Sequence, residues 1–302
     1  MADLQWIDTQ AVKVTLAALL DKFLAVNGGR ARQTQATVRS LVNTFKKTWR
    51  YPLDTAVGEI KPSQLNEWLA QHEPRLKNST YNRYASFVKQ LFEIAVTDRL
   101  IAVSPFNGVS TKSKRPQKPI RHVPTVDQFY RIVEDIRAQP YHADAEESAD
   151  FVQFLGEAGV GQAEAATLTR GDIDWERQVL QFRRQKTQAA FRVPIYPHLQ
   201  SLLRKLESKL AADAPAESKV FKIKHARRAL AAACRRLKFK NFTHRSIRQG
   251  LIRRLWQSGV DYKLISKWQG HRDGGKLILD TYTEVFSDND AEYEAAQLAK
   301  IR

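Results

Sequence analysis

Cysteine is nearly absent from this chain, which excludes several kinds of stabilising and metal-binding chemistry. Cys234 is the only cysteine among the 302 residues, so neither an intrachain disulfide nor a zinc site built on cysteines can form. No apolar run approaches the ~20 residues that cross a bilayer. The opening stretch "MADLQWIDTQAVKV" also lacks the basic-then-apolar pattern of a secretion signal. These absences predict a soluble cytoplasmic protein of a reducing compartment, with no membrane partner.

Acidic residues are also in short supply. There are 32 Asp and Glu against 49 Lys and Arg, which gives a formal net charge of +17. Basic side chains displace the counterions condensed on phosphates, so this excess predicts a polyanionic partner, most simply nucleic acid. A protein bound to DNA is expected to be associated with the nucleoid. A basic surface that only keeps the protein soluble is the alternative. The hydrophobic content of 43% and the chain length fit two folded domains with real cores.

The sequence has no phosphate-binding glycine loop. The closest candidate is "EAGVGQAEAATL", which contains Gly159 and Gly161. A dinucleotide loop would need a third glycine where Glu164 stands and a strand before it, whereas the flanking residues have a helical pattern. No Lys-Ser or Lys-Thr follows, so this is not a nucleoside-triphosphate loop either. The stretch is better interpreted as the start of a helix.

Residues 15–104 are expected to form four amphipathic helices. "TLAALLDKFLAV" places Leu16, Leu20 and Phe23 on one face, and three later segments repeat this period. Thr34 or Thr37 is the expected cap of the second helix, and Ser63 that of the third. Four helices in about 90 residues predict a compact bundle.

A basic, proline-containing segment separates this bundle from the rest of the chain. Residues 107–124 are predicted to be an extended linker, either a solvated tether or a strand laid along a DNA backbone. Thr125 then caps a further helix. The alternating stretch "VLQFRRQKTQAAFRVPIY" predicts a β-hairpin with Lys186 at its turn, and the remainder is mostly helical. The fold class is therefore mainly α, with an α+β second domain that carries a small sheet.

Five sequence blocks in order resemble the tyrosine recombinases, the phage integrase family. They are "AGVGQAEAATL", "KTQAAFRVPI", "THRSIRQGLIRRLWQSG", the Gln-Gly-His at 269–271 and "DTYTEV". The resemblance implies a core-binding helical domain at 1–106 that clamps DNA, the linker at 107–124, and a catalytic-type domain with a helical tail at 125–302. It also implies cleavage and rejoining of duplex DNA through a 3′-phosphotyrosine.

The resemblance assigns a role to each matching residue. Tyr282 is the expected nucleophile, Arg248 binds the phosphate, Lys186 protonates the leaving oxygen, and His271 positions or accepts the tyrosine proton. Arg245 stands where the family has a histidine, unless His244 is aligned there with a shift of one residue. No metal or other cofactor is expected. The implied partners are double-stranded DNA with inverted-repeat sites, further copies of the chain (a dimer per site, a tetramer in synapsis) and accessory DNA-bending proteins.

One departure from the family pattern divides the functional hypothesis. The alignment puts Gly161 where the first catalytic arginine belongs. Losing one such donor to a transition-state phosphate costs ~3–4 kcal/mol. The first hypothesis is an active site-specific recombinase in which Arg245 restores part of the charge. The second is a recombinase-fold DNA-binding protein with weakened or lost catalysis and an architectural or regulatory role. Glu164 is expected to be structural, and Arg253 and Arg254 to be solvent or DNA-backbone cations.

Overall fold

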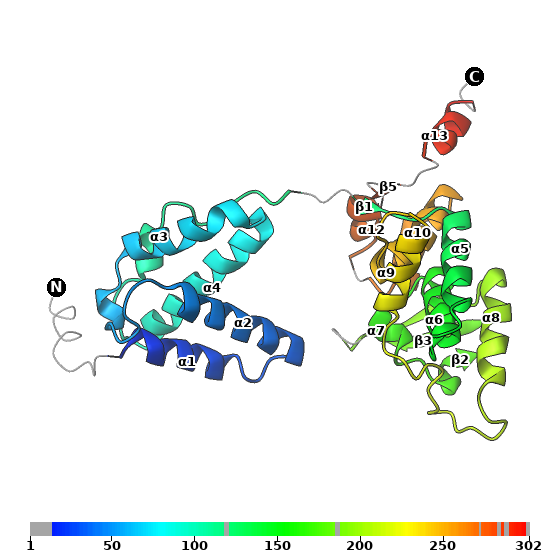
Figure 1. The fold of residues 1–302 in the computed structure, drawn as a ribbon, viewed down its shortest axis with the longest axis horizontal. Coiled ribbons are helices and arrows are strands. Elements are labelled where there is room, and N and C mark those ends of the chain that lie inside the picture. Colours follow the sequence, from blue (N-terminus) through cyan, green and yellow to red (C-terminus); the bar gives the residue numbers. More distant parts are fainter. Residues whose placement is uncertain are drawn as a thin grey trace. The chain divides into compact units, whose positions relative to one another are not determined.

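The computed structural model describes residues 14–117, 121–184, 188–271, 273–282, 285–286 and 290–299. The chain divides into two compact units, Met1–Pro119 and Ile120–Arg302 (Figure 1). None of the helices in the described part is long and apolar enough to cross a membrane.

The first unit is a bundle of helices around an apolar core. Its described α-helices are α1 (Leu16–Val26), α2 (Arg32–Thr48), α3 (Pro62–His72) and α4 (Asn78–Thr97). Leu16, Leu20 and Phe23 are buried, as the helical period predicts. The aromatic side chains of this core include Phe45, which stacks on Trp49 with ring centroids 4.8 Å apart.

Two helix starts in this bundle differ from the sequence prediction. Helix α2 begins at Arg32 with Ala31 as N-cap, so neither Thr34 nor Thr37 caps it. Helix α3 begins at Pro62, before the expected cap Ser63. Proline is well suited to the first helical position because its missing N–H would have no partner there, and this explains the earlier start.

The beginning of the predicted linker is fixed to the bundle. Phe106 and Val109 are buried in the core of the first unit. Tyr81 of α4 donates a hydrogen bond to the carbonyl oxygen of Thr111 (2.7 Å), and Asn82 donates one to that of Lys114 (2.7 Å). The residues up to about 115 are therefore attached to α4 rather than extended freely in solvent.

The second unit combines helices with a small antiparallel sheet, which confirms the predicted fold class. Strands β2 (Ile173–Asp174), β3 (Val179–Arg183) and β4 (Ala190–Pro194) lie in the order β2-β3-β4. The predicted hairpin is β3–β4, paired from Val179 with Pro194 to Arg183 with Ala190. The helices are α5 (Val126–Arg137), α6 (Ala145–Ala158), α7 (Gln162–Ala165), α8 (Pro197–Ser208), α9 (Arg227–Arg236), α10 (His244–Gln257), α11 (Tyr262–Trp268), α12 (Lys276–Tyr282) and α13 (Asp290–Leu298).

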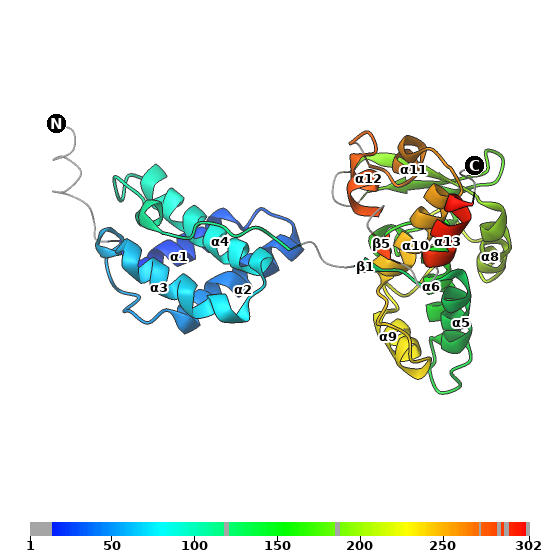
Figure 2. The ribbon, with the colours of Figure 1, turned by 90° about the horizontal axis from the view of Figure 1, so that it is seen from above.

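Helix α6 is the centre of this unit. It is buried along nearly its whole length and packs against α5, α8, α9 and α10 (Figure 2). Thr125 caps α5 through a capping box with Gln128, as predicted. A buried ion cluster joins α6 to its neighbours: the fully buried Asp150 accepts hydrogen bonds from Arg137, Lys205 and Lys209 at 2.7–3.0 Å. Burial raises the pKa of Asp150, but these hydrogen bonds outweigh burial and hold it below its usual range.

Strand β1 (Arg121–His122) pairs in parallel with β5 (Val285–Phe286), so the chain on entering this unit meets the segment that follows Tyr282.

The two cations expected on the surface of α10 are in fact engaged within the protein. Arg253 is only 8% exposed and pairs with Asp290 at the start of α13. Arg254 donates a hydrogen bond to the carbonyl oxygen of Gly156 (3.3 Å), and burial lowers its pKa. The prediction for these residues was wrong because α6 covers α10 at Arg254 and the start of α13 covers it at Arg253.

Candidate functional site

A cavity of about 760 Å³ opens in the second unit where several parts of the chain meet. They include the turn between α6 and α7, the end of the β3–β4 hairpin, the start of α9, the loop before α10 with the first turns of that helix, and, beyond α11, the following loop and the first turn of α12. Four arginines and no carboxylate are among the described residues that line it. The lining residues are Gly161, Gln162, Arg184, Arg227, Leu230, Ala231, Asn241, Phe242, Thr243, His244, Arg245, Arg248, His271 and Leu277. Such a lining suits an anion.

Arg248 is fixed at the side of this cavity by two acceptors. Helix α10 starts from Thr243, whose hydroxyl accepts the amide N–H of Ser246 in a capping box, and Arg248 follows a little over one turn into the helix. Its Nε donates to the carbonyl oxygen of Gly159 and to Oε1 of Gln269, both at 2.8 Å. This guanidinium is therefore oriented before any ligand binds.

Gly159 contributes through its backbone conformation. It caps α6 with a φ of +68°, in the left-handed region that favours glycine. A Cβ at this position would lie 2.9 Å from Leu251 Cδ2 and 3.0 Å from Gln269 Nε2. The turn brings its carbonyl oxygen, at the negative end of α6, to the Nε of Arg248.

Arg184 is a second oriented guanidinium, and the sequence analysis did not select it. Its backbone N–H bonds to the carbonyl oxygen of Ala189 (2.8 Å), which extends the hairpin by one pair beyond β3. Its Nη2 donates to the backbone carbonyl oxygen of Gln269 (2.8 Å), and its Nε lies 3.9 Å from Glu164 Oε1. The signal was present in the alternation of the strand, since Leu180 and Phe182 are buried and Arg184 is next on the same face.

His271 reaches the cavity from the loop after α11. Its backbone N–H donates to the carbonyl oxygen of Ser266 (2.9 Å), and the preceding Gly270 has a φ of +64°. Burial, then the charges of Arg248 and Arg184, lower the pKa of His271 to about 4. The ring is therefore neutral near pH 7 and can accept a proton. Its Nδ1 is buried with no hydrogen-bond partner among the described residues.

Gly161, at the N-cap of α7, leaves a space that an acidic side chain fills. Its φ of −77° and ψ of 159° are extended, so the backbone does not require glycine. A Cβ there would lie 2.3 Å from Glu164 Oε2 and 3.6 Å from Arg248 Nη1. The carboxylate of the buried Glu164 thus occupies the first part of the path that a longer side chain at 161 would take.

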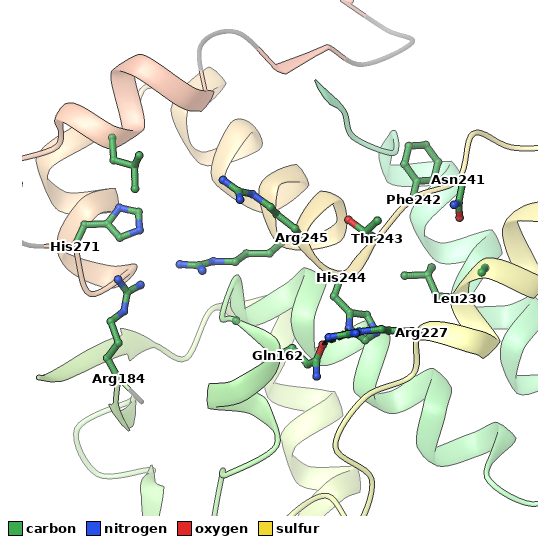
Figure 3. Close-up of a pocket in the computed structure, with 14 residues that line it drawn as sticks. Gln162, Arg184, Arg227, Leu230, Asn241, Phe242, Thr243, His244, Arg245 and His271 are labelled. Atoms are coloured by element: carbon green, nitrogen blue, oxygen red, sulfur yellow. Dashed lines mark hydrogen bonds between the residues drawn. The ribbon is translucent and has the colours of Figure 1, made fainter. Parts of the chain in front are cut away.

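His244 and Arg245, neighbours on α10, have different environments. His244 is 8% exposed, its Nδ1 lies 3.1 Å from Gln162 Oε1, and its Nε2 accepts the N–H of Ala226 (3.3 Å). Burial, followed by the charges of Arg227 and His225, lowers its pKa to about 4. Arg245 is exposed, and its side chain extends into the same open space as those of Arg184 and His271 (Figure 3).

The remaining two predicted site residues are only partly covered by the structure. Tyr282 is the last residue of α12, whose first turn contributes Leu277 to the cavity; its side chain lies outside the described part. Lys186, the predicted turn residue of the hairpin, lies outside the described residues. The structure thus brings Arg248, His271 and Arg245 to one cavity and leaves the placement of these two side chains open.

Comparisons with known proteins identify the class to which this fold and site belong. The profile of the phage integrase family matches residues 123–288. The chain belongs to the phage integrase family, the tyrosine recombinases. No curated protein sequence matches.

Solved structures share the fold along nearly the whole chain. A lambda integrase dimer bound to a COC′ core site is 16% identical, with a TM-score of 0.73 over 93% of this chain and 79% of that one. The integrase of transposon Tn1549 in complex with a circular intermediate DNA is 17% identical, with a TM-score of 0.67 over 94% and 99%. A lambda integrase tetramer bound to a Holliday junction is 15% identical, with a TM-score of 0.71 over 91% and 83%.

Proposed function

We propose that this protein is a site-specific DNA recombinase that cleaves and rejoins duplex DNA through Tyr282. The observation that carries the proposal is the cavity in the second unit, where Arg248, His271 and Arg245 converge and no carboxylate is among the described lining residues. A phosphodiester gains negative charge in its pentacoordinate transition state, and oriented guanidinium groups are the strongest side-chain donors for it.

The proposed cleavage is a transesterification. The hydroxyl oxygen of Tyr282 attacks the scissile phosphorus, the new Oη–P bond forms, and the P–O5′ bond breaks. The DNA is left with a 3′-phosphotyrosine and a free 5′-hydroxyl. His271, which its lowered pKa keeps neutral, accepts the tyrosine proton, and Lys186 donates a proton to the departing 5′-oxygen. Rejoining reverses these steps, so the reaction consumes neither water nor an energy source.

The proposed partner is double-stranded DNA with inverted-repeat sites, bound by a dimer per site and a tetramer in synapsis. The net charge of +17 supports a nucleic-acid partner. The similar lambda integrase structures contain a dimer bound to a core site and a tetramer bound to a Holliday junction. In this proposal the first unit, residues 1–106, clamps the duplex together with the catalytic unit, residues 125–302, and accessory DNA-bending proteins help to assemble the complex near the nucleoid.

A covalent adduct is the direct test of this function. Duplexes covering the gene's own genomic surroundings, each nicked near the candidate cleavage position so that rejoining fails, would be incubated with the protein and separated in SDS. We expect an SDS-resistant protein–DNA adduct that disappears in the Tyr282→Phe variant. Tyr293→Phe, on α13, is the matched control and should form the adduct as the wild type does.

A second function is favoured by one observation: the carboxylate of Glu164 lies where a side chain at Gly161, the position aligned with the family's first arginine, would begin. In this reading the chain is a recombinase-fold protein that binds specific duplex DNA and no longer cleaves it. Specific binding by the wild type without any adduct, together with an adduct from Gly161→Arg, would favour this alternative.

A further inference from the structure

The cavity contains a guanidinium group that none of the family blocks assigns, and its position bears on the missing arginine. A phosphate in this family-type pocket needs two oriented guanidinium groups, and the alignment leaves one place empty at Gly161. Arg248 is one such group. Arg184, which reaches the cavity from the hairpin, is a second oriented arginine.

The two guanidinium groups converge on a single oxygen atom. Arg184 Nη2 donates to the carbonyl oxygen of Gln269 at 2.8 Å, and Arg248 Nη2 lies 3.5 Å from the same oxygen. Both side chains can therefore direct donors toward one acceptor. His271, two residues later on the same loop, lines the same cavity as both arginines, and their charges add to the effect of burial in lowering its pKa.

Arg184 is held in place before a ligand arrives. Its backbone N–H closes the hairpin ladder, its guanidinium lies 5.9 Å from the ring centroid of Phe191, and its side chain is only 22% exposed. An arginine fixed in this way needs little reorganisation to meet a developing charge.

One donor of Arg184 still lacks an acceptor. Its Nε is buried and has no hydrogen-bond partner among the described residues, and the nearest carboxylate oxygen, of Glu164, is 3.9 Å away. A buried guanidinium N–H without an acceptor is destabilising, because it has lost its hydrogen bond to water. A purely structural link between the hairpin and the α11 loop needs only the Nη2 bond to Gln269 and does not explain this vacant donor.

We propose that Arg184 is a catalytic residue that binds a non-bridging oxygen of the scissile phosphate, in place of the arginine missing at Gly161. A phosphate oxygen gives the Nε of Arg184 its acceptor, while Arg248 binds the phosphate from the α10 side. The proposal rests on the proposed recombinase function and assigns the pocket's second arginine to the hairpin rather than to the α6–α7 turn.

The first test uses the full chain and inorganic phosphate, without DNA. Histidines labelled with ¹⁵N would be followed by NMR at pH 6.5 and constant ionic strength while phosphate is added. We expect the His271 signals to move, with roughly ten- to hundredfold weaker binding in Arg184→Gln, since the variant loses a charge-assisted hydrogen bond to phosphate. The matched control is Arg183→Gln, whose exposed side chain bonds to the carbonyl oxygen of Gln188 on the other face of the hairpin.

The second test is adduct formation on the nicked duplex. Arg184→Gln should lower the cleavage rate by about a hundred- to a thousandfold, and Arg183→Gln should leave it unchanged. Gly161→Arg introduced into Arg184→Gln should restore most of the rate. Gly161→Ala in the same background, which displaces Glu164 but adds no guanidinium, should not restore it.

The two tests separate this inference from the function on which it rests. Phosphate binding that depends on Arg184, without any adduct on DNA, would support Arg184 as the phosphate ligand of the pocket but would contradict the recombinase function and, with it, a catalytic role for Arg184. An adduct whose rate is the same in Arg184→Gln and Arg183→Gln would support the recombinase and overturn the inference. A wild-type His271 signal that does not respond to phosphate would also overturn it.

Discussion

His244 should make the second unit sensitive to acid, because its two ring nitrogens are engaged in a way that requires the neutral ring. Nε2 accepts the backbone N–H of Ala226, so it carries no proton, and the proton on Nδ1 is directed at Gln162 Oε1. A proton added to Nε2 would meet the N–H of Ala226 in a site where the ring is 8% exposed. Acid therefore has to break this contact.

The magnitude follows from the difference between the folded and unfolded pKa of His244. The folded pKa is about 4, below the ordinary value of 6.5. Because the folded value is depressed, the neutral ring's contribution to stability is present above pH 6.5 and is lost as the pH falls toward 4. Between pH 7 and pH 4.5 the unfolding free energy should fall by about 2 kcal/mol through His244 alone. His271 contributes in the same direction, so the effect must be isolated by comparing variants.

The assay compares the wild type with His244→Gln in urea unfolding at pH 7 and at pH 4.5. Hydrogen exchange of peptides from α10 reports the stability of the second unit separately from that of the first. The loss of stability between the two pH values should be about 2 kcal/mol smaller in His244→Gln. The control His142→Gln, at an exposed histidine, should behave as the wild type does. An equal loss in the wild type and His244→Gln, or an NMR titration of His244 near pH 6.5, would refute the reasoning.

Two further substitutions test contacts that stabilise the second unit. Gly270→Ala should lower the unfolding free energy by about 2 kcal/mol, since its φ is +64° and a Cβ would lie 2.7 Å from the ring of Phe191; an unchanged melting temperature in calorimetry would contradict this. Asp150→Asn should cost about 3 kcal/mol in urea unfolding, because three basic side chains lose their buried carboxylate. A loss below 1 kcal/mol would mean that Glu146, which also pairs with these cations, is enough to hold them.

The helices and the hairpin were predictable because their apolar residues recur at regular helical or alternating spacing. The stripe of Leu16, Leu20 and Phe23 predicts a helix, and the alternation along 179–194 predicts the hairpin. Helix starts were less predictable, because Pro62 and Ser63 are both good residues for a helix start and only packing decides between them.

The site was predictable only where a motif fixes the position of a residue in the chain. Arg248 and His271 were found through such motifs, and the structure brings both to the cavity. Arg184 and Gln269 were missed because their roles arise from contacts between the hairpin and the α11 loop, 85 residues apart in sequence. Local patterns do not report such contacts, although the alternation of β3 places Arg184 on the buried face.

Arg184 and Arg245 are two candidates to supply the charge that the aligned arginine would carry at position 161, and their surroundings favour Arg184. Arg245 is exposed, so holding it on a phosphate would cost up to about 2 kcal/mol of side-chain conformational entropy. Arg184 is already ordered by the Gln269 carbonyl and by the closing pair of the hairpin, so most of that cost is met on folding. An oriented donor is worth ~3–4 kcal/mol in the transition state, and ordering costs of this size would remove about half of it. The larger rate loss is therefore expected from Arg184→Gln, and the smaller from Arg245→Gln.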